Sequence, residues 1–491
     1  MLWANFLHIY QPPNQTRDIL DKVANESYAP LFRGLREIGG ARLVLNINAV
    51  LTEMLFEAGY VDILDDIKFL ASENRLEFTE SAIYHAFLPL LPSSEIKRQI
   101  ELNNKINKKY FGNLYHPKGF FPPEMGYSLK VAGAVKDLGY EWMILDEISY
   151  RGKVNDCGFD KTYKIKDLGL KVYFRDRRTS NLIMGAIVRR GDSLIKSLQP
   201  VLREERFLIT AMDGETFGHH RPGLEKILFD LCQNPKLSSV LISDLEEYFP
   251  DVQTISPVPS SWASSEKDLL DGLPYKLWKD PSNVIHRWKW QLTNLALREM
   301  EKSRMKVGEK DRRWRKSRAQ IDQALNSCHF WWASPYGWWS LEMVEAGSYQ
   351  VLSAIRSLPL IKKSAKDRAK YLYEKIVFKA FDWQRSGYIR SLFKERESWR
   401  RIPFKDRSEA SQFALVLSVL EKEERSAAKR GEYEQAAKWR DGRFKLENGL
   451  DVYDAMHIVD QLRAEGRLGN FSKLTKKYKD RYRLLVPGQA L

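Results

Sequence analysis

Cysteine is scarce in this chain: Cys157, Cys232 and Cys328 are three residues in 491, and none of them forms a Cys-x-x-Cys pair. This excludes a disulfide framework and a structural zinc site built on thiolates. No run approaches the ~20 apolar residues of a membrane span. The opening residues 1–8 also lack the basic segment of a signal peptide. We therefore expect a cytoplasmic protein without membrane contact.

Acidic residues are outnumbered, which gives a net charge of +15. The basic excess is scattered, with dense patches at 312–316 and 476–483, and no nucleic-acid recognition motif accompanies it. We interpret it as a solvated surface and expect no nucleic-acid partner. The hydrophobic share of 43% and the charged share of 29% are those of a globular protein. A chain of this length exceeds a single small core, so we expect a barrel-sized domain plus helical domains.

The first half of the chain alternates short apolar runs with amphipathic helical ones. Repeated strand-then-helix units imply parallel strands joined by right-handed crossovers, and about seven or eight of them close a barrel. Chemistry in such barrels lies at the carboxyl ends of the strands. The expected strands are 2–7, 42–46, 76–79, 119–121, 142–145, 172–174, 207–211 and 240–242.

Helical periodicity dominates the second half. A Pro- and Ser-rich loop at 256–265 ends the strand-bearing region, and few strand signals follow residue 280. We expect a barrel over 1–265, a helical domain over 266–360 that packs on the barrel and completes its cleft, and a charged helical region over 361–491.

The segment after the fourth expected strand presents a fixed carboxylate. Pro122 and Pro123 restrict the backbone immediately before Glu124, so the carboxylate has one direction and little entropy to lose. Phe120 and Phe121 argue against a simple surface turn. These are the properties of an attacking carboxylate.

A second acidic cluster, Asp213-Gly214-Glu215, follows the uncharged run 207–212. Apolar surroundings favour the neutral form of a carboxyl group, which suits a general acid. Asp, Glu and the nearby His219 are also possible metal ligands. No second spaced motif pairs with them, so we expect no metal and no cofactor.

Two carboxyl groups presented from separate strand ends are what cleavage of a glycosidic bond requires, one as nucleophile and one as acid. Other polar and aromatic residues near strand ends are candidates for binding the substrate. For each of them a core or capping role is the alternative, because histidines and tryptophans in apolar company are commonly structural. The candidates are His8, Gln11, Glu77, His85, Glu215, His219, Trp262, Trp331 and Trp332.

Taken in order, these segments resemble glycoside hydrolase family 57. His8-Ile-Tyr10-Gln-Pro is similar to the first family motif, with Tyr10 in place of its second histidine, and the segment around Glu77 and His85 is similar to the second. Phe121-Pro-Pro-Glu124 and Asp213-Gly-Glu215 match the third and fourth, whereas the fifth is matched only loosely at 243–244. The resemblance runs from residue 2 to about 264, and more loosely to about 358.

This resemblance implies a (β/α)7, distorted TIM-like barrel followed by a mainly α-helical region. It also implies a retaining double displacement on α-glucans, with Glu124 as nucleophile and Asp213 as acid/base. The activity would be that of an α-amylase, a 4-α-glucanotransferase or a branching enzyme. Two alternatives stay open: a non-catalytic glucan-binding homologue, suggested by Tyr10, and a metal-dependent polysaccharide deacetylase, suggested by the acids and histidines around Asp213.

A shorter resemblance lies in the tail. Residues 428–447, within a helical stretch near 420–448, resemble the UVR motif, a helical hairpin that pairs with a partner hairpin. It implies docking of a protein partner or self-association.

Overall fold

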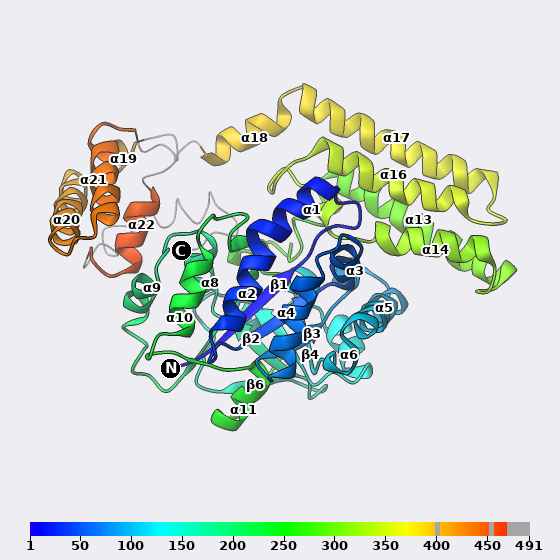
Figure 1. Ribbon diagram of the computed structural model, residues 1–491. Helices are drawn as coiled ribbons and strands as arrows, with labels where there is room; N and C mark the ends of the chain where they lie inside the picture. The colour runs from blue at the N-terminus through cyan, green and yellow to red at the C-terminus, as the bar shows by residue number, and fades with distance from the viewer. Residues whose placement is uncertain (398–402, 451–455, 469–491) are drawn as a thin grey trace.

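The computed structural model describes residues 1–397, 403–450 and 456–468. Its centre is a curled, mostly parallel sheet in the order β10-β6-β7-β5-β4-β3-β2-β1-β8, with β9 paired to β1 (Figure 1). The β6–β7 pair is antiparallel. The strands are β1 Leu2–Ile9, β2 Leu43–Ile47, β3 Leu76–Glu80, β4 Gly119–Phe120, β5 Trp142–Asp146, β6 Thr162–Ile165, β7 Lys171–Arg175, β8 Phe207–Asp213, β9 Ser238–Ser239 and β10 Val252–Ile255.

The sheet curls until β7 meets β8. At the start of β7 its free edge is occupied by β6, whose Tyr163 pairs with Val172. Beyond the end of β7 the same edge contacts β8: the Asp176 amide donates to the Ile209 carbonyl at 2.8 Å. Strands β1, β2, β3, β4, β5, β7 and β8 thus form a ring, and the expected (β/α)7 barrel with a helical C-terminal region is confirmed.

Alternation along the strands separates an inner core from an outer one. On β1, Phe6 belongs to the cluster inside the ring and Leu7 to the cluster under the surrounding helices. On β8, Ala211 lies inside and Met212 outside. The same period of two places His8 and Asp213, at the ends of these strands, on the inner face. The sequence alternation therefore selects which polar side chains reach the barrel mouth.

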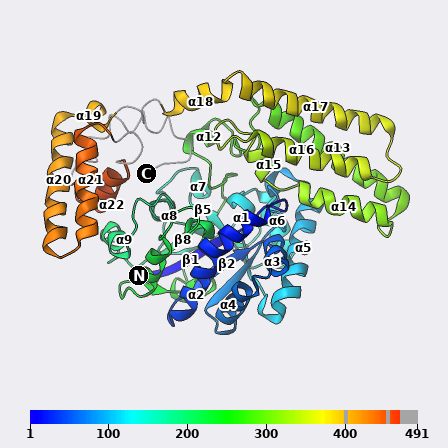
Figure 2. The same ribbon diagram turned by 45° about the horizontal axis from the view of Figure 1, so that its top comes forward.

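Helices cover the outside of the ring (Figure 1). They are α1 Arg17–Val23, α2 Ala29–Glu37, α3 Ala49–Glu57, α4 Val61–Ser72, α5 Ser93–Phe111, α6 Leu129–Asp137, α8 Arg177–Met184, α9 Gly191–Leu198, α10 Glu225–Cys232 and α11 Leu245–Tyr248. The short helices α7 Ile148–Arg151 and α12 Glu266–Leu270 lie instead toward the helical group at one end of the barrel (Figure 2).

The second half is helical, as expected, and makes two groups. One group lies across one end of the barrel, and the other stands beside α9 (Figure 2). The first consists of α13 Val284–Val307, α14 Arg312–Ala324, α15 Cys328–Trp331, α16 Leu341–Ser357 and α17 Lys363–Arg385, with α18 Tyr388–Glu397 following. The second consists of α19 Phe404–Arg407, α20 Ala410–Lys429, α21 Tyr433–Glu447 and α22 Met456–Ala464.

The strand expected at 240–242 is wrong. Strand β9 ends at Ser239, and a 3₁₀ turn, Ile242–Asp244, follows instead. Strands β6 and β10 were missed because each has four residues and includes polar ones, Thr162 and Lys164 in β6 and Gln253 and Thr254 in β10, so neither forms an apolar run. The basic patch at 312–316 opens α14, whereas 476–483 lies outside the described residues. In the described part of the chain, no helix combines the length and the apolar character needed to cross a membrane.

Helices α20 and α21 form a helical hairpin, and residues 428–447, which resemble the UVR motif, make up its turn and α21. An Ala-rich amphipathic pattern predicts a helical hairpin whether or not the segment is related to the UVR motif. The resemblance and the partner that it implies therefore stay predictions.

Candidate active site

Glu124 lies in a short turn, Pro123–Met125, directly after β4. Its backbone is left-handed, with φ 62° and ψ 17°, a conformation that costs an ordinary residue roughly 1–2 kcal/mol. The turn is fixed on both sides: the Met125 amide donates to Pro122 at 2.8 Å, and the Trp262 amide donates to the Glu124 carbonyl at 3.1 Å. The surroundings thus hold a strained backbone that aims this carboxylate.

Polar side chains lie around the Glu124 carboxyl group. The indole Nε1 of Trp262 donates to its Oε2 at 2.7 Å, and the nearby Ser327 hydroxyl favours its charged form. The ring Nδ1 of His85 lies 3.8 Å from its Oε1. Burial raises the pKa of Glu124 to about 7, against the opposing effect of Trp262 and Ser327. The side chain keeps 17% of its surface exposed, so a ligand at the barrel mouth can reach it.

Two histidines flank this carboxylate in one aromatic stack. His85 stacks on His8 at 4.8 Å and on Tyr10 at 4.5 Å, and His8 stacks on Phe121 at 4.7 Å. Burial lowers the pKa of His8 to about 4, and burial together with His8 lowers that of His85 well below its usual value. Both rings are therefore neutral near pH 7.

The ring nitrogens of these histidines differ in their partners. Nδ1 of His8 lies 2.8 Å from the Asn46 amide oxygen, and Nδ1 of His85 lies 2.9 Å from the Ser327 hydroxyl. The buried Nε2 of His85 has no hydrogen-bond partner among the described residues. A buried polar atom without a partner is uncommon in folded proteins, so this nitrogen is a candidate for a ligand contact.

Asp213 ends β8, and its Cα pairs with that of His8 in the sheet register. Burial raises the pKa of Asp213 well above its usual value, and the charges of Glu215 and Glu124 raise it further, against an opposing effect of Arg175. The influence of Glu124 means that the two carboxyl groups lie within each other's electric field. Burial and these neighbouring charges thus favour the protonated form of Asp213.

Glu215 is held by hydrogen bonds from the first strand loop and the first helices. Its Oε1 accepts from the Tyr10 amide at 3.1 Å, from the Gln11 side chain at 3.2 Å and from the Tyr28 hydroxyl. Tyr10 contributes to this contact through its backbone, while its ring stacks on His85 and His8 and its hydroxyl donates to the Tyr84 carbonyl at 3.5 Å. Gln11 and Glu215 thus fix the loop beside Asp213.

Two expected site residues lie elsewhere. The Glu77 side chain does point into the barrel. In the sheet register it is level with Phe6 and Val44, two residues before His8 along the strands, so it lies deeper in the barrel than His8. Its carboxylate binds the amide and hydroxyl of Ser243. His219 lies outside the stack, with Nδ1 2.7 Å from the Glu26 carboxylate. Neither position supports the substrate contact that the sequence predicts.

The expected tryptophans have distinct positions. Trp262 donates to Glu124 and packs against Phe121. Trp331 packs against the inner core and meets Trp332 edge to face at 5.0 Å, and both rings are partly exposed. Trp262 thus contacts the carboxylate itself, whereas Trp331 and Trp332 form an aromatic surface on the helical group.

Asp213, Glu215 and His219 do not converge on one point. Glu215 is occupied by Tyr10, Gln11 and Tyr28, and His219 by Glu26. Within residues 1–397, 403–450 and 456–468, no three His, Cys, Asp or Glu side chains are grouped so as to hold a metal ion.

Sequence reasoning missed Ser327. This residue precedes α15 in the helical half, and its amide donates to the His85 carbonyl at 3.0 Å. Its hydroxyl reaches both His85 and Glu124. A lone serine 203 positions after Glu124 (327 minus 124) carries no local signal, because only packing of the helices on the barrel brings it to the carboxylate.

A buried ion cluster behind the site was also missed. The Asp146 carboxylate, at the end of β5, accepts from Arg175 at 2.6 Å and from Arg177 at 2.8 Å. Arg177 in turn donates to the carbonyls of Trp262 and Ser264 at 3.1 and 3.0 Å. The cluster therefore fixes the loop that places Trp262 on Glu124. An aspartate directly after the apolar run 142–145 was the signal available in the sequence.

Replacing Asp146 with alanine is expected to lower the free energy of unfolding by about 3–5 kcal/mol, because two buried guanidinium groups lose their counter-charge. Burial raises the pKa of Asp146, but Arg177 and Arg175 outweigh it, so the net shift is downward and the stabilisation is present at neutral pH. Urea unfolding at pH 7 measures the change. Asp137→Ala, which removes an exposed partner of Lys97, should cost about 1 kcal/mol or less. Equal losses in the two variants would contradict the role of the cluster.

Replacing Trp262 with phenylalanine is expected to shift the acidic side of the pH profile of kcat/KM to higher pH. With a pKa of about 7, Glu124 is ionised above pH 7, so kcat/KM should fall as the pH drops through that value. The indole N–H stabilises the charged form, so its loss raises the pKa further. Initial rates across pH 5–9 measure the shift. Trp339→Phe, which removes a donor to Gln384, is the matched control and should leave the limb in place. An unchanged limb in Trp262→Phe would rule out this hydrogen bond as a determinant.

A ring of parallel strands with two buried carboxyl groups at the mouth is the arrangement of a glycoside hydrolase. Residues 5–255 match the model of glycosyl hydrolase family 57, and the chain belongs to this family. It is 22% identical over 281 residues to an α-amylase of Pyrococcus horikoshii, a match that covers 54% of this chain and 43% of that protein. The chain thus matches less than half the length of this curated relative.

Solved structures share the fold. The 4-α-glucanotransferase of Thermococcus litoralis superposes with a TM-score of 0.58 at 18% identity, covering 73% of this chain and 60% of the other. The family 57 branching enzyme of Pyrococcus horikoshii superposes with a TM-score of 0.59 at 18% identity, covering 76% of this chain and 94% of the other.

Proposed function

We propose that the protein cleaves α-glucans with retention of configuration, by double displacement through a glycosyl-enzyme intermediate. The observation that carries the proposal is the unequal environment of two neighbouring buried carboxyl groups. Trp262 and Ser327 favour the charged form of Glu124, whereas burial and two acidic neighbours raise the pKa of Asp213. Such a pair supplies an ionised nucleophile and a protonated acid at the same pH.

In the first step the Glu124 carboxylate attacks the anomeric carbon while Asp213 transfers its proton to the leaving oxygen. The charge on Asp213 then makes it the base that takes a proton from water or from an acceptor sugar, and the bond to Glu124 breaks. Retention requires the two carboxyl groups roughly 5–5.5 Å apart when substrate is bound. The Nε2 of His85 would contact a sugar hydroxyl, and Ser327 would orient both His85 and Glu124.

The substrate class rests on the family and on its relatives. The similar proteins are named as an α-amylase, a 4-α-glucanotransferase and a branching enzyme, all of which act on α-linked glucose chains. The aromatic surface of Trp331 and Trp332 suits the apolar faces of successive sugar rings. We further propose that the helices over 266–360 complete the cleft, since Ser327 reaches the nucleophile from there.

Incubation of the full chain with defined maltooligosaccharides tests the activity. We expect shorter products if water is the acceptor, and longer or branched ones if a sugar is. Proton NMR of the first products should give the α-anomer. Saturable binding of maltooligosaccharides without turnover would support the non-catalytic alternative instead, and an inverted product would exclude Glu124 as nucleophile.

A further inference from the structure

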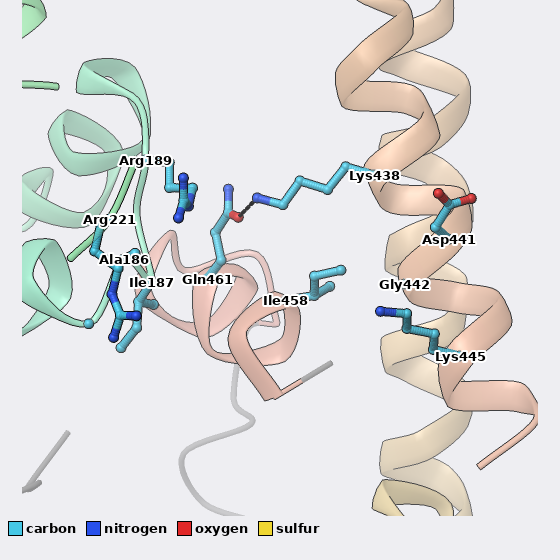
Figure 3. Close-up of a pocket in the computed structure, with 11 residues that line it drawn as sticks. Ala186, Ile187, Arg189, Arg221, Lys438, Asp441, Gly442, Lys445, Ile458 and Gln461 are labelled. Atoms are coloured by element: carbon cyan, nitrogen blue, oxygen red, sulfur yellow. Dashed lines mark hydrogen bonds between the residues drawn. The ribbon is translucent and has the colours of Figure 1, made fainter. Parts of the chain in front are cut away.

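A cavity of about 330 Å³ lies between the barrel and the C-terminal helices, away from the carboxylate pair. Its barrel wall is the α8–α9 loop, Gly185 to Arg189, together with Arg221, and its other wall is formed by α21 and α22 (Figure 3). The volume is at the lower end of the range for small-molecule pockets, roughly 300–1,000 Å³. It suits a compact ligand and not a polymer.

The rim of the cavity is cationic. Arg189 and Arg221 approach from the barrel, and Lys438 and Lys445 from α21 (Figure 3). Asp441 is the acidic residue in the lining, and it forms an ion pair with Arg440 at 2.9 Å. Its charge is thus engaged by an arginine outside the cavity.

The cations that face each other across the cavity bind neutral groups. Arg189 donates to the Pro222 carbonyl at 3.4 Å, and Lys438 donates to the Gln461 amide oxygen at 2.9 Å. Burial and the charge of Arg189 both lower the pKa of Lys438, against an opposing effect of Glu465, which itself pairs with Arg467. Cations crowded in this way are stabilised by an anion between them.

The floor of the cavity is apolar. Ile187 comes from the barrel and Ile458 from α22, which packs so closely on α21 that a Cβ at Gly442 would lie 2.2 Å from the Ile458 side chain. A pocket with a cationic rim and an apolar floor matches a molecule with a charged group on a compact organic body.

We propose that this cavity binds a phosphorylated small molecule, with its phosphate oxygens on Arg189, Arg221 and Lys438 and its organic part against Ile187 and Ile458. Guanidinium and ammonium groups from two sides fit a phosphate monoester or diphosphate. A nucleotide and a sugar phosphate share this chemistry.

The barrel wall of the site continues from β7 and β8, and β8 also carries Asp213. Arg221 is bridged to Phe217, and the neighbouring His220 amide donates to the Glu215 carbonyl at 2.8 Å. The α8–α9 loop follows β7 through α8. A phosphate bound there would therefore contact both the segment that follows Glu215 and the helices α21 and α22.

Isothermal titration of the full chain tests the proposal without reference to turnover. The probes are ADP, glucose 1-phosphate and inorganic pyrophosphate, each in about 0.15 M salt so that diffuse attraction is screened, with adenosine and glucose as uncharged counterparts. We expect one saturable site for at least one phosphorylated probe and none for the uncharged ones. Preference for ADP or for glucose 1-phosphate identifies the organic part.

The variants are Arg189→Gln with Lys438→Gln, and Arg221→Gln alone. Each should weaken binding at least about tenfold, since charged hydrogen bonds are lost. Arg203→Gln removes the same charge from an exposed loop position outside the lining and should bind like the wild type. Unliganded melting temperatures establish that the variants are folded. Absence of binding for all three probes, or equal weakening in Arg203→Gln, would overturn the proposal.

Discussion

Replacing Glu124 with glutamine is expected to abolish turnover of maltooligosaccharides, with kcat/KM falling by at least about 10³-fold. The amide keeps the size of the side chain and its hydrogen bond from Trp262, but it has no charge with which to attack the anomeric carbon. Substrate binding should persist, because His85, Ser327 and the aromatic surface are untouched. Initial rates and equilibrium titration of maltooligosaccharides separate the two effects.

The matched control is Glu77→Gln. Glu77 is another glutamate that points into the barrel, but it binds Ser243 and lies two residues deeper along the strands than His8. Its amide oxygen still accepts from Ser243, so we expect near wild-type rates. Full activity in Glu124→Gln would refute the assignment of the nucleophile. Loss of activity in Glu77→Gln with an unchanged melting temperature would show that Glu77 is needed for activity and belongs to the active site.

Replacing Asp213 with asparagine is expected to lower kcat by about 10²–10⁴-fold on maltooligosaccharides, the usual contribution of a general acid. The loss should depend on the leaving group. An α-glucosyl fluoride needs no protonation to depart, so formation of the intermediate should remain fast while its hydrolysis is slow. Rapid-quench kinetics should then give a burst of fluoride followed by a slow steady state.

A second consequence concerns pH. Burial and the acidic neighbours Glu215 and Glu124 raise the pKa of Asp213. In the proposed mechanism, loss of the Asp213 proton at high pH causes the fall of activity on the alkaline side of the pH profile. The alkaline limb of the wild-type profile should therefore disappear in Asp213→Asn. A variant that loses natural substrate and glucosyl fluoride equally, or that keeps the alkaline limb, would contradict the acid/base role.

The strand pattern was largely readable from the sequence. Seven of the eight expected strands coincide with observed ones, and all seven belong to the ring. Short, nearly continuous apolar runs indicate strands that are buried on both faces. The run at 240–242 misled because its apolar residues pack into the inner core from a 3₁₀ turn, so they are buried without pairing in the sheet.

Some residues of the candidate site could be predicted from the sequence, and others could not. His8 and Asp213 lie at the ends of their strands, and Glu124 and His85 come shortly after strand ends, so a local pattern marks all four. Glu77 has a similar pattern, but it begins its strand instead of ending it, and depth along the barrel axis is not encoded in alternation alone. The ion pair of Asp146 with Arg175 joins two strands, and the sequence contains its members without their pairing.

By itself, the sequence determined the barrel, its family and the two carboxyl groups at its mouth, because strand-forming runs, prolines and alternation are properties of neighbouring residues. The tertiary structure decided what surrounds those carboxyl groups: Trp262 and Ser327 on Glu124, Arg175 and Glu215 around Asp213, and the cationic cavity between Arg189 and Lys438. These contacts join residues far apart in the chain. Their burial and electrostatics, which shift the pKa values of the two carboxyl groups, exist only once the helices have packed on the barrel.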